Sequence, residues 1–139
     1  MIELIADCDC TTALLKNPEP NGEDIDILVD MIAQSKRPLL ICGGGVVRGR
    51  AHQEFREFAE KLDAPVAITV MGGGGFPGGH PLTTGMVGMH GSQASNLACN
   101  ECDLLIAVGC RFSDRVALNQ VHFVLGNFFC PISFRRAGF

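Results

Sequence analysis

The sequence lacks the long runs of one residue class that mark nucleic-acid-binding and membrane proteins. It has no extended basic run, and its 11 Lys and Arg are outnumbered by 15 Asp and Glu, for a net charge of −4. We therefore expect no nucleic-acid partner, because such a chain offers no basic patch to a phosphate backbone. The longest apolar stretches, around residues 38–47 and 104–110, fall well short of the ~20 residues that span a bilayer. No membrane association is expected.

The first residues also lack the pattern of a secretory signal, since Glu3 stands where a cationic segment would be. Seven cysteines are an odd number, and without a signal we expect free thiols in a reducing compartment. Cys99 and Cys102 have the spacing of zinc ligands. However, the first lies in a helical stretch and the second adjoins a strand, where thiols are more often core residues. No metal site is expected.

Three continuous apolar runs of strand length occur, at residues 38–42, 65–70 and 103–109. Before each of the first two, apolar residues recur at helical spacing: Ile25, Leu28, Val29 and Ile32, then Phe55, Phe58, Ala59 and Leu62. A short helix is expected at residues 92–100. Strands that are apolar throughout are buried on both faces, as in a parallel sheet covered by helices. The pattern predicts an α/β fold with a doubly wound parallel sheet.

The composition divides the chain into three parts. Residues 1–22 contain a Pro-rich connector and fit the pattern poorly at their start, whereas residues 23–116 carry the α/β pattern. Residues 117–139 have no Asp or Glu but hold five of the nine Phe. Neither helical spacing nor turn residues connect this last part to the rest. We interpret it as an atypical tail, which a shifted reading frame or a fragment boundary would explain.

Glycines stand at the ends of all three predicted strands, at residues 43–45, at residues 72–75 and at Gly109. Ligands of open parallel sheets bind at this edge. Glycines let a backbone approach a ligand and present N–H groups to phosphate, and the guanidinium groups of Arg111 and Arg115 suit a diphosphate. Strand-to-helix turns favour glycine in any case. Glycines at three successive strand ends nevertheless favour an anionic ligand.

Common cofactor motifs are absent. Residues 43–45 are not followed by the third glycine of the dinucleotide fingerprint, whose place Arg48 takes, and no acidic residue ends the second strand to hold a ribose. No P-loop sequence and no spacing typical of a Ser/His/Asp triad occur, so no catalytic residue is predicted. His90 fits a ligand contact or a solvated loop equally well. The residues alone indicate a cradle for an anionic cofactor without naming a reaction.

Five segments carry a family resemblance: RPLLICGGG at 37–45, APVAITVMG at 64–72, FPGGHPL at 76–82, GMVGMHG at 85–91 and DLLIAVGCRFSDRV at 103–116. Together they closely resemble the central domain of the acetolactate synthase (acetohydroxyacid synthase) large subunit, a thiamine-diphosphate enzyme. The resemblance covers roughly residues 17–116. The fourth segment and the end of the fifth are specific to members that contain FAD and to their close relatives.

The resemblance implies a Rossmann-like sheet that binds FAD, so that residues 23–116 would be a central FAD-binding domain. The residues implied to contact FAD or lie near it are Gly43, Gly44, Gly45, Thr69, Val70, Met71, Met89, His90, Gly91, Gly109, Cys110, Arg111, Asp114 and Arg115. Of these, Asp114 and Arg115 would lie near the flavin and the substrate channel. FAD in this family is generally regarded as structural, because the carboligation involves no net redox change.

The resemblance also implies the reaction of the whole subunit, in which two pyruvates, or pyruvate and 2-oxobutyrate, condense with loss of CO₂ in branched-chain amino-acid synthesis. The family parts that hold thiamine diphosphate and Mg²⁺ have no counterpart here, and no Gly-Asp-Gly sequence occurs. A fragment that is inactive alone is therefore expected. Its implied partners are 2-oxo acids, further copies in a homo-oligomer and a regulatory subunit, in the cytoplasm or a plant plastid.

Two alternatives stay open at this point. The first is the central domain of a related carboligase such as glyoxylate carboligase, whose Gly-rich pattern is similar, although the Met-His-Gly sequence at residues 89–91 favours the synthase. The second is a stand-alone nucleotide-binding or regulatory module of the same fold.

Overall fold

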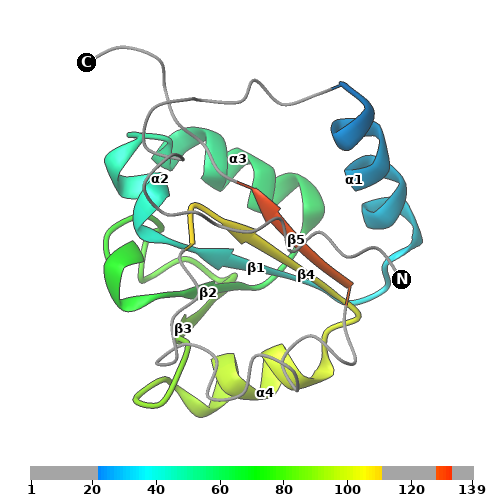
Figure 1. Ribbon diagram of the computed structural model, residues 1–139. Coiled ribbons are helices and arrows are strands. Elements are labelled where there is room, and N and C mark those ends of the chain that lie inside the picture. Colours follow the sequence, from blue (N-terminus) through cyan, green and yellow to red (C-terminus); the bar gives the residue numbers. More distant parts are fainter. Residues whose placement is uncertain (1–21, 111–127, 133–139) are drawn as a thin grey trace, which may run out of the picture.

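Figure 1 shows an open sheet of parallel strands with helices on both faces. The computed structural model describes residues 22–110 and 128–132. The strands are β1 (Pro38–Cys42), β2 (Val66–Ile68), β3 (Thr83–Met86), β4 (Leu104–Val108) and β5 (Phe128–Ile132). The helices are α1 (Gly22–Gln34), α2 (Gly44–Arg48), α3 (His52–Leu62) and α4 (Gln93–Glu101), with a 3₁₀ turn, η1, at Val70–Gly72.

Strand β1 lies at the centre of the sheet, whose strand order is β3-β2-β1-β4-β5. Its residue Leu40 pairs with Val66 on one side and with Ile106 on the other, both in parallel register. The chain first extends the sheet through β2 and β3 and then returns to add β4 and β5 beyond β1. This reversal makes the boundary between β1 and β4 the topological switch point, where ligands of such sheets bind. The predicted doubly wound parallel sheet is confirmed.

The sheet is buried on both faces, which explains why its central strands are apolar throughout. Leu40 and Ile106 belong to a core that includes Phe55 of α3 and is joined by Leu28 of α1. Alternate residues point the other way, and Leu39, Ile41 and Leu105 form a second core with Cys99 of α4. Figure 1 accordingly shows α1 and α3 on one face and α4 on the other. Burial of each Leu or Ile side chain stabilises the folded state by about 2 kcal/mol relative to an exposed side chain.

Helix α3 buries the predicted face, because Phe55 and Ala59 are fully enclosed and Phe58 packs against them. Helix α1 forms where predicted, but its buried stripe is displaced. Leu28, Met31 and Ile32 pack against the core, whereas Ile25 and Val29 are 46% and 56% exposed. The four-residue pattern thus predicts the helix correctly, but it does not predict which side of the helix packs against the sheet.

The predicted strand boundaries differ by a few residues. The run at residues 65–70 contributes only β2, since the chain turns into η1 after Thr69, whose hydroxyl accepts a hydrogen bond from the N–H of Gly72. Strand β4 is one residue shorter at each end than predicted. Helix α4 begins at Gln93, and Ser92 caps it by accepting from the N–H of Ser95.

The sequence pattern does not predict β3, which lies in the glycine-rich loop, or β5, which lies in the atypical tail. Predictions for residues 1–21 and for Arg111, Asp114 and Arg115 fall outside the described residues. Among the helices that the structure describes, none is long and apolar enough to cross a membrane.

Candidate functional site at the carboxyl edge of the sheet

The ends of the three predicted strands meet at one edge of the sheet. The N–H of Gly43, directly after β1, donates to the carbonyl oxygen of Val108 in β4 at 2.9 Å. The N–H of Gly45 donates to the carbonyl oxygen of Gly109 at 2.8 Å. On the other side, the N–H of Thr69 donates to the carbonyl oxygen of Cys42 at 2.9 Å. The structure thus brings together most of the site residues that the sequence analysis named.

The glycines at this edge allow its backbone segments to touch. A β-carbon on Gly45 would lie 2.6 Å from the α-carbon of Gly109, and one on Gly44 would lie 2.9 Å from the carbonyl oxygen of Met71. Gly109 also has a φ of +61°, in the left-handed region that favours glycine. Close packing between strand ends therefore explains these glycines independently of a ligand, and their contact with a cofactor remains a prediction.

The 3₁₀ turn η1 carries two large apolar side chains into solvent. Thr69 is 7% exposed, and its hydroxyl donates to the carbonyl oxygen of Cys42 at 3.3 Å while accepting from the N–H of Gly72. This anchors the turn, on which Val70 and Met71 are 73% and 72% exposed. Exposed apolar side chains on an anchored turn are available to a flat, apolar ring.

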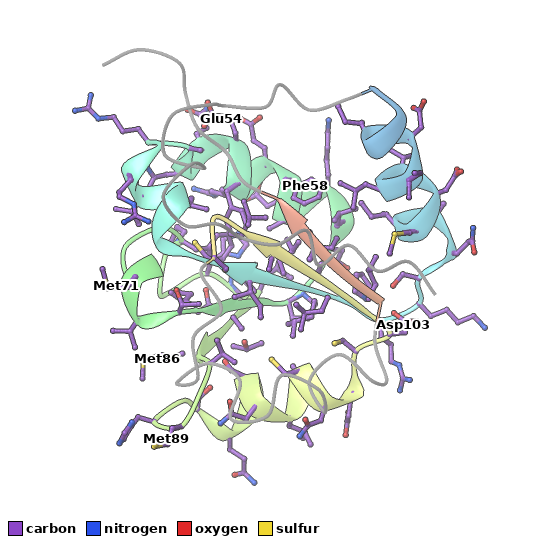
Figure 2. All side chains as sticks on the ribbon, in the orientation of Figure 1. Glu54, Phe58, Met71, Met86, Met89 and Asp103 are labelled. Carbon is purple, nitrogen blue, oxygen red and sulfur yellow. The ribbon has the colours of Figure 1, made fainter. Side chains whose placement is uncertain are left out.

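A second turn lies between β3 and α4 and contains the predicted residues Met89, His90 and Gly91. Met89 is 59% exposed and His90 is exposed, while the N–H of Gly91 donates to the carbonyl oxygen of Gly88 at 2.9 Å. In Figure 2, Met71, Met86 and Met89 lie along the same side of the molecule. The two turns thus present methionines at the same edge of the sheet.

Cys42, Cys99 and Cys102 are buried thiols, and Cys110 is half-buried. Burial raises the pKa of Cys99 to about 12 and that of Cys102 to about 11, and both belong to the core on the α4 face. Within residues 22–110 and 128–132, no group of three or more His, Cys, Asp or Glu could hold a metal ion. At the candidate edge, burial and the nearby Cys42 raise the pKa of Cys110 to about 12, so its thiol is a packing group.

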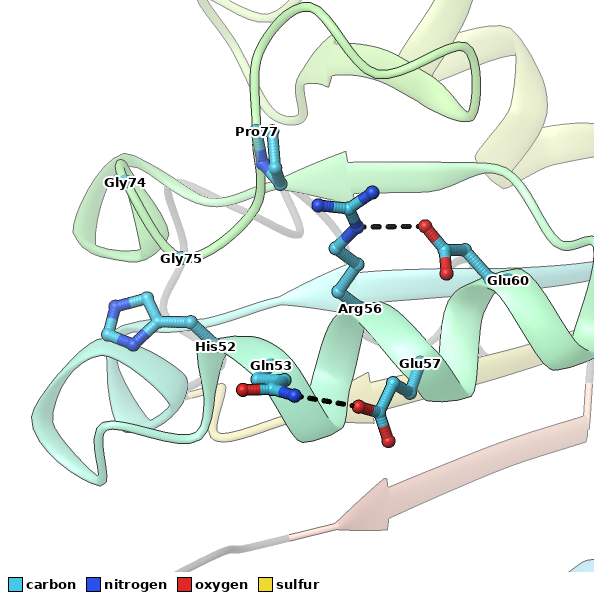
Figure 3. Close-up of a pocket in the computed structure, with 8 residues that line it drawn as sticks. All are labelled: His52, Gln53, Arg56, Glu57, Glu60, Gly74, Gly75 and Pro77. Atoms are coloured by element: carbon cyan, nitrogen blue, oxygen red, sulfur yellow. Dashed lines mark hydrogen bonds and ion pairs between the residues drawn. The ribbon is translucent and has the colours of Figure 1, made fainter.

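A hollow of about 510 Å³ lies elsewhere, between α3 and the glycine-rich loop (Figure 3). Its lining consists of His52, Gln53, Arg56, Glu57, Glu60, Gly74, Gly75 and Pro77, which include none of the predicted site residues. Two polar pairs occupy its wall: Arg56 with Glu60 at 2.8 Å and Gln53 with Glu57 at 3.0 Å. Each exposed pair is explained by its own hydrogen bond, and we propose no function for the hollow.

The edge fits an apolar, planar group better than it fits acid–base chemistry. Its described candidates contribute backbone, a buried hydroxyl, exposed apolar side chains and His90, with no carboxylate among them. Val70, Met71 and Met89 offer apolar contacts to such a group. Asn96 also supports this edge, because it hydrogen-bonds to the turn that bears Met89. Its position six residues after His90 carries no sequence signal of that contact.

Comparison with known proteins identifies the family. Residues 25–125 match the family model described as thiamine pyrophosphate enzyme, central domain. Over 101 residues the chain is 56% identical to a probable acetolactate synthase large subunit of Methanocaldococcus jannaschii, and over 100 residues it is 51% identical to an acetolactate synthase large subunit of Parasynechococcus marenigrum. An acetolactate synthase large subunit of Corynebacterium glutamicum is 46% identical over 97 residues.

These matches cover 71%, 71% and 70% of this chain but only 17%, 16% and 16% of the three relatives, respectively. The chain thus spans about a sixth of the length of the proteins it is similar to. The matched region includes β1 to β4 and the whole carboxyl edge described above. With the family model covering residues 25–125 and the parallel sheet in place, the chain belongs to the thiamine pyrophosphate enzyme family, as its central domain.

Proposed function

We propose that this chain is the FAD-binding central domain of an acetolactate synthase large subunit. The names and identities of its relatives support the choice of enzyme. The observation that carries the FAD assignment is the exposure of Val70, Met71 and Met89, three large apolar side chains, at the carboxyl edge of a doubly wound sheet. Such sheets bind their ligands at this edge.

In this proposal the two turns hold the flavin ring, and the glycine-bearing ends of β1 and β4 lie beside the diphosphate. Apolar side chains of Met71 and Met89 exchange contact with water for contact with the ring, which stabilises the bound state. The sequence-predicted contacts of Arg111 would add charge for the diphosphate. The role of the domain in this proposal is to bind and orient the cofactor, and none of its candidate residues within 22–110 forms an acid–base pair.

Fluorescence titration of FAD with the whole chain tests this proposal. We expect a saturable change in flavin fluorescence, and a Kd raised about three- to tenfold by Met71→Ala or Met89→Ala through loss of apolar contact. Val29→Ala is the matched control, because Val29 is 56% exposed on α1. A chain that is folded by circular dichroism and gives no saturable change would contradict the proposal, as would an equal effect of Val29→Ala.

The whole enzyme would condense two pyruvates, or pyruvate and 2-oxobutyrate, with loss of CO₂, for branched-chain amino-acid synthesis. Thiamine diphosphate held with Mg²⁺ would supply the nucleophilic carbon, through parts of the subunit that this chain does not match. We expect no acetolactate from pyruvate when the chain is supplied with thiamine diphosphate, Mg²⁺ and FAD. Acetolactate formed under these conditions would contradict the assignment of catalysis to parts of the subunit that this chain does not match.

The proposal extends to partners and location. The full-length enzyme would act on 2-oxo acids, assemble as a homo-oligomer and bind a regulatory subunit, in the cytoplasm or in a plant plastid. Size-exclusion chromatography with light scattering on a full-length relative and on this chain would test whether the domain takes part in assembly.

A further inference from the structure

The turn that bears Met89 and His90 is held by a side chain from the neighbouring helix. The side-chain amide of Asn96, in the first half of α4, makes two hydrogen bonds to the backbone of Gly88. Its Oδ1 accepts from the N–H of Gly88 at 3.1 Å, and its Nδ2 donates to the carbonyl oxygen of Gly88 at 3.0 Å. Both contacts require this orientation of the amide, because a backbone N–H can only donate and a carbonyl oxygen can only accept.

The two bonds act on a residue with an unusual backbone. Gly88 has a φ of +114°, which side-chain-bearing residues rarely adopt. A glycine at this position is free to take other conformations. The amide of Asn96 engages both polar groups of that one peptide residue and so selects a single geometry for the start of the turn.

Helix α4 provides a fixed base for Asn96. The hydroxyl of Ser92 donates to the carbonyl oxygen of Thr84 in β3 at 2.7 Å, and the N–H of Ser92 donates to the carbonyl oxygen of Met86 at 2.8 Å. Ser95 is fully buried, and its hydroxyl lies 2.9 Å from that of Thr84. The helix start is thus bonded to the edge strand at several points, and Asn96 follows directly.

We infer that Asn96 is a positioning residue for the FAD site, which sets the conformation of residues 88–91 and thereby the placement of Met89 and His90. Asn96 acts through Gly88 and does not itself touch the flavin. The inference rests on the proposed FAD site and names a residue outside its predicted contacts. If the turn is in its binding conformation only a tenth of the time without the amide, the Kd for FAD rises about tenfold.

The test uses the whole chain with Asn96→Ala, and Asn100→Ala as the matched control. Asn100 is the same residue type on the same helix, one turn later and exposed. Three quantities are measured: the Kd for FAD, the visible circular dichroism of flavin at saturating FAD, and hydrogen exchange at the amides of Gly88, Gly91 and Ser92. A general loss of stability would not alter the flavin spectrum of saturated, folded protein.

We expect Asn96→Ala to raise the Kd about tenfold, to change the flavin spectrum and to speed exchange at the three amides, while Asn100→Ala changes none of these. Asn96→Asp, which keeps the volume but replaces the donor to the Gly88 carbonyl by an acceptor, should also raise the Kd. It is the second variant if Asn96→Ala fails to fold.

If the wild-type chain binds FAD and both Asn96 variants have the same Kd and flavin spectrum as wild type, the inference is overturned. The proposed function then stands. Faster exchange with an unchanged Kd would overturn it too, since the turn would then not determine affinity. Wild-type chain that binds no FAD overturns the proposed function and this inference together.

Discussion

Gly45 and Gly109 touch backbone to backbone: a β-carbon on Gly109 would lie 2.6 Å from the α-carbon of Gly45, and the N–H of Gly45 donates to the carbonyl oxygen of Gly109 at 2.8 Å. The two residues follow β1 and β4, the strands on either side of the switch point. The two halves of the sheet are therefore joined at the candidate site by a contact that only glycine permits.

Gly109→Ala should destabilise the chain by about 3 kcal/mol. The added methyl would meet backbone atoms, which cannot move aside as a flexible side chain can, and the φ of +61° disfavours alanine. Urea denaturation measures the loss. Gly78→Ala is the control, because a β-carbon there meets nothing within 4 Å, and its effect should stay within about 0.5 kcal/mol. Equal stability of the two variants would mean that the strand ends do not pack as described.

Asp103 should give the chain a component of stability that is lost in acid. Its carboxylate accepts hydrogen bonds from the Ser35 hydroxyl and from the N–H groups of Lys36 and Arg37 at 2.5, 2.7 and 2.9 Å. Partial burial raises the pKa of Asp103, but these hydrogen bonds outweigh it and lower the pKa from 3.8 to about 2. A lowered folded pKa means that the stabilisation is complete above pH 4 and disappears as pH falls through about 2.

Asp103→Asn should therefore lower the urea midpoint at pH 6, by an amount equivalent to about 1 kcal/mol after allowance for solvent screening. The difference from wild type should shrink between pH 4 and pH 2.5. Asp30→Asn, which changes an exposed carboxylate of α1, should leave the midpoint unchanged. A difference for Asp103→Asn that stays constant down to pH 2.5 would contradict the assignment.

His80 should stabilise the loop that connects β2 to β3. Its ring contacts Phe76 edge-on at 4.9 Å between centroids, its Nδ1 accepts from the N–H of Leu82 at 3.2 Å, and its Nε2 lies 3.1 Å from Glu60 of α3. His80→Ala should cost about 1–2 kcal/mol and expose residues 73–79 to limited proteolysis. His52→Ala, an exposed residue at the start of α3, should do neither. Unchanged proteolysis of His80→Ala would show that the loop is held by other contacts.

The thiols of Cys42, which is buried, and of Cys110, which is half-buried, should react slowly while the chain is folded. Burial raises the pKa of Cys42 to about 11 and that of Cys110 to about 12, so at pH 8 about one thiol in a thousand or fewer is the reactive thiolate. Iodoacetamide labelling followed by residue-resolved mass spectrometry should find both unlabelled in native chain and labelled in urea. Rapid native labelling would contradict the placement of Cys42 in the core or of Cys110 against it.

Much of the fold is readable from local pattern. The apolar runs that become β1 and β4 are buried on both faces, so their composition alone separates them from exposed strands. Phe55 and Ala59 mark the inner face of α3 by spacing. Strand β3 escapes detection because its residues, Thr83–Met86, form no apolar run; pairing with β2 and a hydrogen bond from Ser92 to Thr84 hold it in place. Such long-range contacts leave no periodic signal.

The candidate site was predictable to a similar degree. Glycines at the strand ends could be assigned to one edge, because parallel strands end together, and the turns that carry Met71 and Met89 lie there. The sequence does not predict what each of these glycines contacts. Spacing cannot distinguish a glycine that admits a ligand from one that admits another backbone, and Gly45 does the latter. Asn96 was missed because its partner, Gly88, is reached only through a folded turn.

An amide ¹H–¹⁵N correlation spectrum of the chain titrated with FAD tests the proposed FAD site most directly. We expect saturable shifts concentrated at residues 43–45, 69–72 and 88–91, with α1 and the hollow beside Arg56 unaffected. Absence of saturable shifts at the carboxyl edge in a folded chain, or shifts centred on that hollow instead, would contradict the claim that this domain binds FAD at the strand ends.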